Sequence, residues 1–262
     1  MMIEASTPMK DEALRRVAIR HAWGARTHRG NVRATNQDSL VVEPELGLYA
    51  VLDGMGGAAS GDVASRLAAE QLVDFVRQNY LGRQHLPLRD LLESAIDAAA
   101  AAVFDLAASD ASHHGMGTTV VACLFGHTGQ VLVAHAGDSR AYLLRNRDMR
   151  QLTRDHTIWQ MYIEEGRVLC EGERFLKAML TRNLGEVRGV MPDVLEQALE
   201  AGDRLLLCSD GLHEAVPVEV MVEILGSTHA PADIAQQLID TALSGACSDN
   251  VSALVIATDA SE

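Results

Sequence analysis

The feature that most constrains this chain is a short apolar run that ends on an aspartate and is followed at once by glycines. Leu48 to Leu52 is bounded by glycines on both sides, which predicts a buried strand rather than a helix. That strand places the carboxylate of Asp53 at its own end. Gly54 and Gly56 then allow a sharp turn and a close approach of a ligand to the main chain. A single Asp-Gly pair is most often only a turn, so this one indicates a functional site only if the same arrangement recurs along the chain.

The arrangement does recur along the chain. Asp210 ends the apolar run 205–209 and precedes a glycine, Asp138 closes the run 131–137, and Asp249 stands just before the run 251–257. Carboxylates cost several kcal/mol to hold near apolar surroundings unless positive charge offsets them. Four carboxylates at the ends of four predicted strands therefore indicate hard divalent cations bound by oxygen, with Mn²⁺ or Mg²⁺ preferred.

Charge and composition exclude several classes of function. The formal net charge of −14 argues against a nucleic-acid surface, because phosphate backbones are bound through excess Lys and Arg. The apolar fraction of 48% is sufficient for a sizeable core. No apolar run is long enough to span a bilayer, and residues 1–16 lack the apolar core of a signal peptide, so a cytoplasmic location is expected. Cys123 and Cys208 lie within predicted strands, and no cysteine pair has the spacing of a zinc or redox site.

The pattern of apolar residues predicts a mixed α+β chain. Residues 1–16 are expected to be a flexible lead-in, followed by a single domain over 17–260 with a mobile flap at about 155–189. Strands joined by short turns at 118–145 predict an antiparallel meander, and 194–199 and 204–208 a strand pair. His135, within an apolar run, is interpreted as a hydrogen-bonded core residue rather than a ligand. Strands are further expected at 17–28, 40–42 and 251–257, and helices from Ser60 or Asp62 through Val76 and at 87–108, 157–165, 217–225 and 231–243.

The polar segments between these elements resemble those of one known family. The matching segments span nearly the whole chain and occur in the family's order: Arg33-x-x-Asn36-Gln37-Asp38, Asp53-Gly54-Met55-Gly56-Gly57, Gly117-Thr118-Thr119, Gly137-Asp138-Ser139-Arg140, Leu180-Thr181-Arg182, Ser209-Asp210-Gly211 and Asp249-Asn250. The chain is similar to metal-dependent serine/threonine protein phosphatases of the protein phosphatase 2C family, in their bacterial form. The resemblance implies a four-layer α-β-β-α sandwich of two antiparallel sheets flanked by helices.

The resemblance also implies a role for each residue of the site. Asp53 would bridge two metal ions, the carbonyl of Gly54 would bind one of them, and Asp210 and Asp249 would hold the other. Asp138, with Asp210, would help to bind a third, weaker ion. Arg33 would bind the phosphate, which its guanidinium suits by forming two parallel hydrogen bonds. A hydroxide shared by the metals would attack phosphorus directly, without a covalent phosphoenzyme. Asp53, Asp210 and Arg33 would thus carry the catalysis.

Two positions depart from many eukaryotic members of the family. Gln37 stands where they have a glutamate, and Met55 where they have a histidine proposed as general acid. Gln37, like the neighbouring Asp38, is expected to lie behind the metal ligands, where it binds a metal-coordinated water. Met55 cannot donate a proton. The implied substrates are proteins phosphorylated by a serine/threonine kinase, and the chain is expected to act as a monomer.

Two other readings remain open at this point. One is a dinucleotide-binding enzyme, since Gly54-x-Gly56-x-x-Ala59 follows a strand and precedes a helix. It is disfavoured because Asp74, near the place of the expected acidic residue, lies within a predicted helix. The other is a catalytically silent phosphoprotein-binding module of the same fold, which the complete set of four aspartates disfavours.

Overall fold

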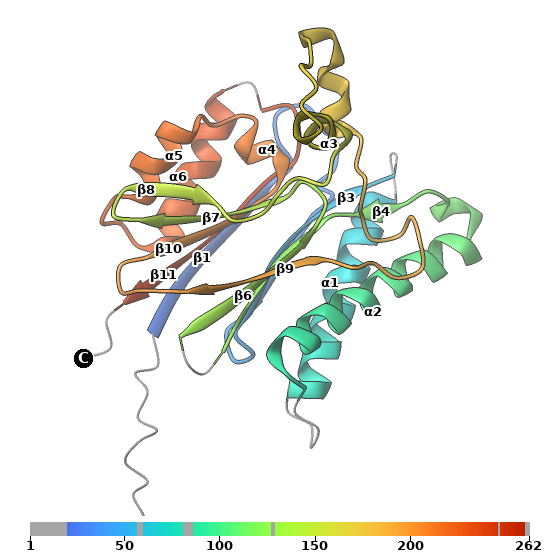
Figure 1. Cartoon of the computed structure of the whole chain (residues 1–262), viewed down its shortest axis with the longest axis horizontal. Coiled ribbons are helices and arrows are strands. Elements are labelled where there is room, and N and C mark those ends of the chain that lie inside the picture. The colour runs from blue at the N-terminus through green and yellow to red at the C-terminus, as the bar shows by residue number, and fades with distance from the viewer. Residues whose placement is uncertain (1–19, 57–59, 81–85, 127–128, 246, 260–262) are drawn as a thin grey trace, which may run out of the picture.

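Two antiparallel sheets form the centre of the molecule, and helices cover the outer face of each (Figure 1). The computed structural model describes residues 20–56, 60–80, 86–126, 129–245 and 247–259. The layers are those of the expected four-layer α-β-β-α sandwich. The lead-in expected at 1–16 lies outside the described residues, as do Gly57 and Ala59 of the glycine motifs.

All paired neighbours in both sheets run antiparallel. The first sheet has the order β1 (Arg20–His28), β11 (Val251–Asp259), β10 (Arg204–Cys208), β7 (Arg140–Arg145) and β8 (Asp148–Gln151). The second has the order β2 (Asp38–Glu43), β3 (Leu48–Met55), β5 (Val120–Phe125), β6 (Gln130–Ala136) and β9 (Asp193–Ala198), with β4 (Gly117–Thr118) pairing with the end of β3.

Two helices pack against each sheet, and shorter helical segments lie in the connections. Helices α1 (Gly61–Tyr80) and α2 (Leu88–Ser109) cover the second sheet, and α5 (Val218–Leu225) and α6 (Pro231–Ser244) cover the first. The shorter segments are η1 (Ala111–His113), α3 (Ile158–Glu164), η2 (Glu171–Ala178) and α4 (Asp210–His213).

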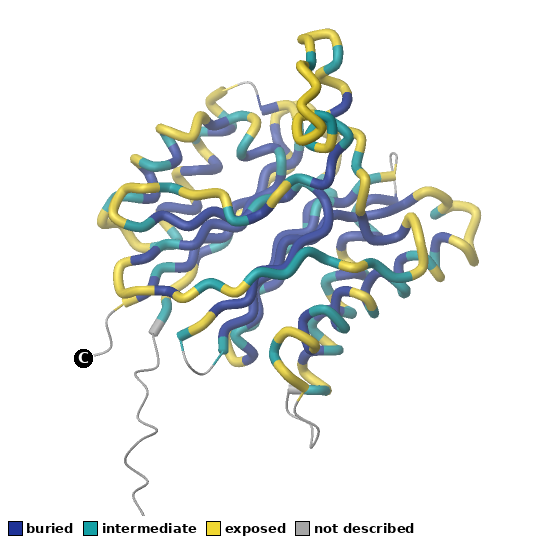
Figure 2. The backbone as a smooth tube through the Cα atoms, viewed as in Figure 1, coloured by how far each residue is buried: buried dark blue, intermediate teal, exposed yellow. Residues whose placement is uncertain are grey.

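The continuous apolar runs of the sequence follow from burial on both faces of each sheet. In β3, Tyr49 and Val51 point between the sheets, whereas Leu48 and Leu52 point toward α1 and α2. Successive side chains alternate between the faces of a strand, so a strand buried on both faces is apolar at nearly every position. Figure 2 shows these strands as the most buried part of the chain.

The structure corrects two predictions of strand pairing. The expected meander is wrong in its last step, because β5 and β6 pair with each other but β7 pairs with β10 in the other sheet. The expected pair of β9 and β10 is also wrong, since β9 pairs with β6. In both places a short loop crosses between sheets. Loop length alone does not distinguish this crossing from a hairpin, and Gly137, at φ 117°, turns the chain at the first crossing.

The sheet topology excludes the dinucleotide-binding reading. That motif requires a parallel β-α-β unit, but β3 pairs antiparallel with β2, β4 and β5. Asp74 lies within α1. Within the described part of the chain, no helix has the length and apolar character needed to cross a bilayer.

Within the expected flap, residues 155–189, the part that contains α3 and η2 stands out from the sandwich at the top of Figure 1. Leu184, near its end, instead lies in the core beside Thr118 of β4. The base of the flap is closed by main-chain hydrogen bonds from Ile158 to Met179 (2.9 Å) and from Thr181 to His156 (2.8 Å). The segment was expected to be irregular, but it contains helical turns. Hydrogen bonds join the two chain segments at its base to each other.

The layer between the sheets provides a test of the fold. Leu254, on the interior strand β11, is fully buried there. We expect Leu254→Ala to lower the free energy of unfolding by about 2–5 kcal/mol, through lost burial and the cavity left behind. Val168→Ala, at a side chain that is 94% exposed, is the control and should change it by less than about 0.5 kcal/mol. Urea unfolding of both variants measures the difference, and equal midpoints would contradict the proposed packing.

Candidate metal centre

The four aspartates singled out in the sequence lie around one pocket of about 510 Å³. Its lining includes Asp53, Asp138, Asp210 and Asp249, together with Arg33, Gln37, Gly54 and Met55. The topology explains the convergence. Strands β3 and β6 are both antiparallel to β5, so their C-terminal ends lie at the same end of the second sheet. Likewise, the end of β10 lies beside the start of β11 in the first sheet.

Asp38 lies behind this pocket and joins the two sheets. It stands directly opposite Asp53 in the pairing of β2 with β3. Its Oδ2 accepts hydrogen bonds from the hydroxyls of Ser209 (2.8 Å) and Ser252 (2.6 Å), which belong to the first sheet and its connection. Burial raises the pKa of Asp38 to about 6, although these hydrogen bonds act in the opposite direction. Asp38 therefore adds negative potential behind Asp53 from a fixed position.

Burial and mutual repulsion act together on the central carboxylates. The pKa values of Asp53 and Asp210 are raised well above the usual range, first by burial and then by neighbouring carboxylates. For Asp53 the largest such contribution comes from Asp38, and for Asp210 it comes from Asp138. The Oδ1 atom of Asp210 is buried and has no hydrogen-bond partner among the described residues. A buried, unpartnered oxygen within an all-oxygen donor set fits a hard divalent cation.

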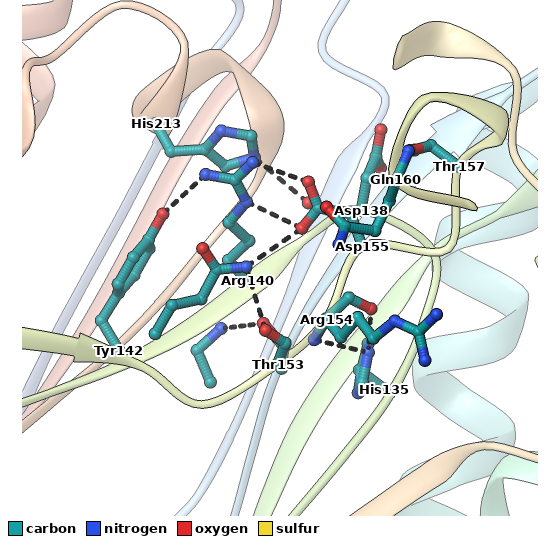
Figure 3. A network of polar contacts seen from close by, with 12 residues as sticks. His135, Asp138, Arg140, Tyr142, Thr153, Arg154, Asp155, Thr157, Gln160 and His213 are labelled. Carbon is teal, nitrogen blue, oxygen red and sulfur yellow. Dashed lines mark hydrogen bonds and ion pairs between the residues drawn. The ribbon is translucent and has the colours of Figure 1, made fainter. Parts of the chain in front are cut away.

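Asp138 lies in the turn between β6 and β7, and it also borders a second pocket on the flap side. Burial, followed by repulsion from Asp155, raises its pKa to about 7. Arg140 holds the base of the flap through two hydrogen bonds to Asp155 (2.8 and 2.6 Å) and one to the hydroxyl of Tyr142 (2.9 Å) (Figure 3). The Nε2 of His213 donates to the Asp138 carbonyl at 3.1 Å. These contacts attach the start of β7 to the base of the flap, and the turn at Asp138 to α4.

Arg33 reaches the pocket from the loop between β1 and β2. Its guanidinium donates to Oδ2 of Asp249 at 2.6 Å, and this contact raises the pKa of Arg33. Its side chain remains 54% exposed, so the rest of the guanidinium can contact a ligand. The loop is held in place by Asn250, whose Oδ1 accepts from the Gln37 amide (2.8 Å) and whose Nδ2 donates to the Thr35 carbonyl (2.9 Å).

Gly54 and Gln37 border the pocket through a close approach of the main chain. A Cβ on Gly54 would stand 2.0 Å from the carbonyl oxygen of Gly61, so only glycine fits there. The carbonyl of Gln37 accepts hydrogen bonds from the Gly54 amide (3.1 Å) and the Ser65 hydroxyl (2.6 Å). Met55 lines the same pocket with a thioether, which has no proton to donate.

Several residues that position these side chains had no role predicted from the sequence. The Oγ1 of Thr119 accepts a hydrogen bond from the Asp53 amide (3.0 Å) and lies 2.7 Å from the Oγ of Ser139. Ser209, Ser252 and Asn250 hold Asp38 and the Arg33 loop as described above. Thr119, Ser139, Ser209 and Asn250 belong to recognised motifs, but their contacts cross between elements and could not be read from spacing. Ser252 lies in an apolar run, and nothing in the sequence pattern indicated its role in binding Asp38.

The chain is similar to proteins of one family over most of its length. The family model described as Protein phosphatase 2C matches residues 23–251. "Serine/threonine protein phosphatase PstP" of Mycobacterium tuberculosis is 37% identical over 242 residues, or 92% of this chain and 45% of that protein. This chain thus spans about half the length of that relative.

The alignment with this chain covers almost the whole length of other similar proteins. "Serine/threonine phosphatase stp" of Listeria innocua is 35% identical over 236 residues, which are 88% of this chain and 93% of that protein. A crystal structure of the catalytic domain of PstP in complex with two manganese ions is 36% identical. It has a TM-score of 0.80 and covers 92% of this chain and 99% of that one.

A second group of possible ligands, His135, His156 and Asp193, is not part of the lining of the aspartate pocket and has ligand atoms within 4.8 Å of one another. The two rings stack nearly parallel, with centroids 4.5 Å apart and planes at 7°. Because a metal must lie in the plane of each imidazole that binds it, stacked rings are unsuited to sharing one ion. Arg182 already pairs with Asp193 at 2.5 Å.

These histidines instead serve as hydrogen-bonding groups of the core. The Nε2 of His135 lies 2.7 Å from the Arg154 carbonyl, and the Nδ1 of His156 accepts from the Gly137 amide at 3.2 Å. His135 is only 2% exposed. The interpretation of His135 as a hydrogen-bonded core residue is therefore confirmed.

His156 makes stability depend on pH. Burial, followed by repulsion from His135, lowers its pKa to about 4. Between about pH 6.5 and 4 the unfolded chain therefore binds a proton that the folded chain excludes, so stability is full above this range and falls as the pH falls through it. We expect His156→Asn to make the slope of unfolding free energy against pH shallower by up to about 1.4 kcal/mol per pH unit. Denaturant unfolding at half-unit pH steps measures the slope, with the exposed His229→Asn as control, and an unchanged slope would contradict this assignment.

Proposed function

The chain belongs to the protein phosphatase 2C family, and on that premise we propose that it is a metal-dependent protein serine/threonine phosphatase. Its substrates would be phosphoserine and phosphothreonine side chains of proteins, and water would attack the phosphorus atom directly. The observation that carries the proposal is the convergence of four aspartates and Arg33 on one pocket from segments far apart in the sequence.

The donor set of the pocket suits two divalent cations, with Asp138 available for a third. Asp53 and Gly54 would hold one ion, and Asp53, Asp210 and Asp249 the other. When bound, Mn²⁺ or Mg²⁺ ions supply Lewis-acid chemistry, lowering the pKa of a coordinated water and offsetting charge on the phosphoryl group. The manganese ions in the structure of the PstP catalytic domain support this choice of metal.

The chain's own residues would bind and orient the substrate. The exposed guanidinium of Arg33 lies at the pocket edge, where it can donate two parallel hydrogen bonds to the phosphate. The Arg33–Asp249 contact holds the guanidinium beside the pocket before substrate binds. Asp38 and Gln37 would act from behind, by fixing Asp53 and a coordinated water. Since Met55 has no proton to donate, the leaving oxygen would take its proton from solvent or from another group.

Several wider features belong to the same proposal. The catalytic unit would comprise residues 17–260, and the flap would influence substrate choice because Ala178 and Leu180 line the aspartate pocket. The substrates would be products of a serine/threonine kinase, and the chain would act as a monomer. All four cysteines are free, as is usual in a reducing compartment, which supports a cytoplasmic location.

Removal of one proposed metal ligand tests the centre itself. We expect Asp210→Asn to lower turnover of an aryl phosphate on the order of a hundredfold, because a metal ligand is lost while the fold is retained. The rise in melting temperature produced by Mn²⁺ should also disappear, since a cation stabilises the state that binds it.

Asp240→Asn, at an exposed carboxylate on α6, is the matched control and should behave as the parent chain. Near-normal turnover of Asp210→Asn would remove Asp210 from the site. If the folded parent chain gave no turnover at any Mn²⁺ concentration, the catalytically silent phosphoprotein-binding module would be favoured.

Arg33 provides a test of substrate binding. We expect Arg33→Ala to raise the KM for a phosphothreonine peptide by about tenfold, because a charge-assisted contact to phosphate is lost. Arg33→Lys keeps the charge but not the paired donors and should give an intermediate value. Steady-state kinetics at saturating Mn²⁺ measure both variants, with Arg26→Ala as control. An unchanged KM for Arg33→Ala would mean that Arg33 does not touch the substrate.

A further inference from the structure

A groove lined chiefly by apolar side chains lies next to the aspartate pocket, at the C-terminal end of α2. It has a volume of about 460 Å³, and its apolar walls include Phe104, Ala107 and Ala108 of α2 together with Met116. Three polar or charged residues, His114, Asn183 and Glu186, complete the side-chain lining. We call this hollow the α2 groove. Ala108 is exposed and Phe104 is half-buried, so a ligand can reach these side chains from solvent. Their burial by an apolar partner would be favourable, since apolar surface would leave water.

The α2 groove adjoins the aspartate pocket at Met55. This residue follows Asp53 and Gly54 on β3 and lines both hollows. Its methyl group lies 3.1 Å from the position of a Cβ on Gly117, so the thioether packs closely against that main chain. A phosphorylated side chain in the aspartate pocket would therefore have its flanking residues beside Met55 and the groove.

A second pocket borders the aspartate pocket at other residues and has a different chemistry. The pocket on the flap side, about 550 Å³, shares Asp138 and Asp210 with the aspartate pocket. Its lining includes charged side chains, among them Arg174, Lys177 and Glu214. The aspartate pocket is thus flanked by a charged pocket and by an apolar groove.

We propose that the α2 groove binds an apolar side chain of the phosphoprotein substrate, close in sequence to the phosphorylated residue. The proposal rests on the proposed phosphatase function and adds a specificity to it. The volume of the groove is within the range of sites that bury a whole side chain or small ligand. Because the two flanks differ, an apolar residue should be preferred on only one side of the phosphothreonine, either N-terminal or C-terminal to it.

The test uses phosphothreonine peptides in which one of the three positions before or after the phosphothreonine is Leu and the others are Asn. With the full chain and saturating Mn²⁺, Leu on one side should raise kcat/KM about tenfold over the all-Asn peptide. Leu at the corresponding positions on the other side should change it less than about twofold. Equal values for all peptides, or equal preference on both sides, would overturn the proposal.

A pair of variants assigns the preference to the groove. Ala108→Glu introduces a charge into the groove wall and should abolish the advantage of Leu. Ala101→Glu makes the same change two turns earlier on α2, outside the groove lining, and should retain it. Melting curves confirm that both variants are folded. Retention of the preference in Ala108→Glu, with Ala101→Glu unchanged, would place the specificity elsewhere and overturn the proposal.

Hydrolysis of an aryl phosphate, which has no peptide chain, separates this inference from the proposed function. Both glutamate variants should keep the parent rate, because neither alanine contacts the aspartate pocket. A chain that hydrolyses the aryl phosphate but shows no peptide preference retains the proposed function and loses only this inference. A chain that hydrolyses neither substrate loses both.

Discussion

Mutual repulsion among carboxylates in one buried space is the constraint on which the rest of this structure depends. Asp53 and Asp210 are held where burial and neighbouring charges both raise their pKa values. A folded chain keeps such a cluster only when its framework is stable enough to oppose the repulsion, or when cations relieve it. The sandwich supplies the first condition with three apolar layers, and the donor set of the pocket suits the second.

Hydrogen bonds that cross between the sheets keep the carboxylates at a defined separation. Asp38 belongs to the second sheet, yet its carboxylate is bound by Ser209 and Ser252 of the first sheet and its connection. Asn250, beside Asp249, likewise holds the main chain of the loop that carries Arg33. These contacts couple the relative position of the sheets to the shape of the pocket. A change in sheet packing would therefore alter the aspartate pocket even where none of its side chains is replaced.

Some of this arrangement could be predicted from local pattern, and some could not. The apolar runs indicated buried strands. The glycines after Asp53 were expected to let a ligand approach the main chain, and the structure shows that the missing Cβ of Gly54 also allows close packing against the Gly61 carbonyl. The partners of two strands were predicted wrongly: β7 pairs with β10 and not with β6, and β9 pairs with β6 and not with β10. A short loop that crosses between sheets has the same length as a hairpin loop, so loop length could not distinguish the two. The roles of Ser252 and Thr119 were not predicted because their partners lie far away in the sequence.

The sequence by itself determined which residues are candidates to carry the chemistry. Aspartates at strand ends, followed or preceded by glycine and asparagine, are local patterns, and local patterns can be read from one chain. Only the tertiary structure decided how these groups meet. The antiparallel register places Asp38 opposite Asp53, and the flap-side pocket and the α2 groove flank the centre. These features depend on the packing of distant segments, because a pocket is a property of the surfaces that several elements form together and not of any one segment.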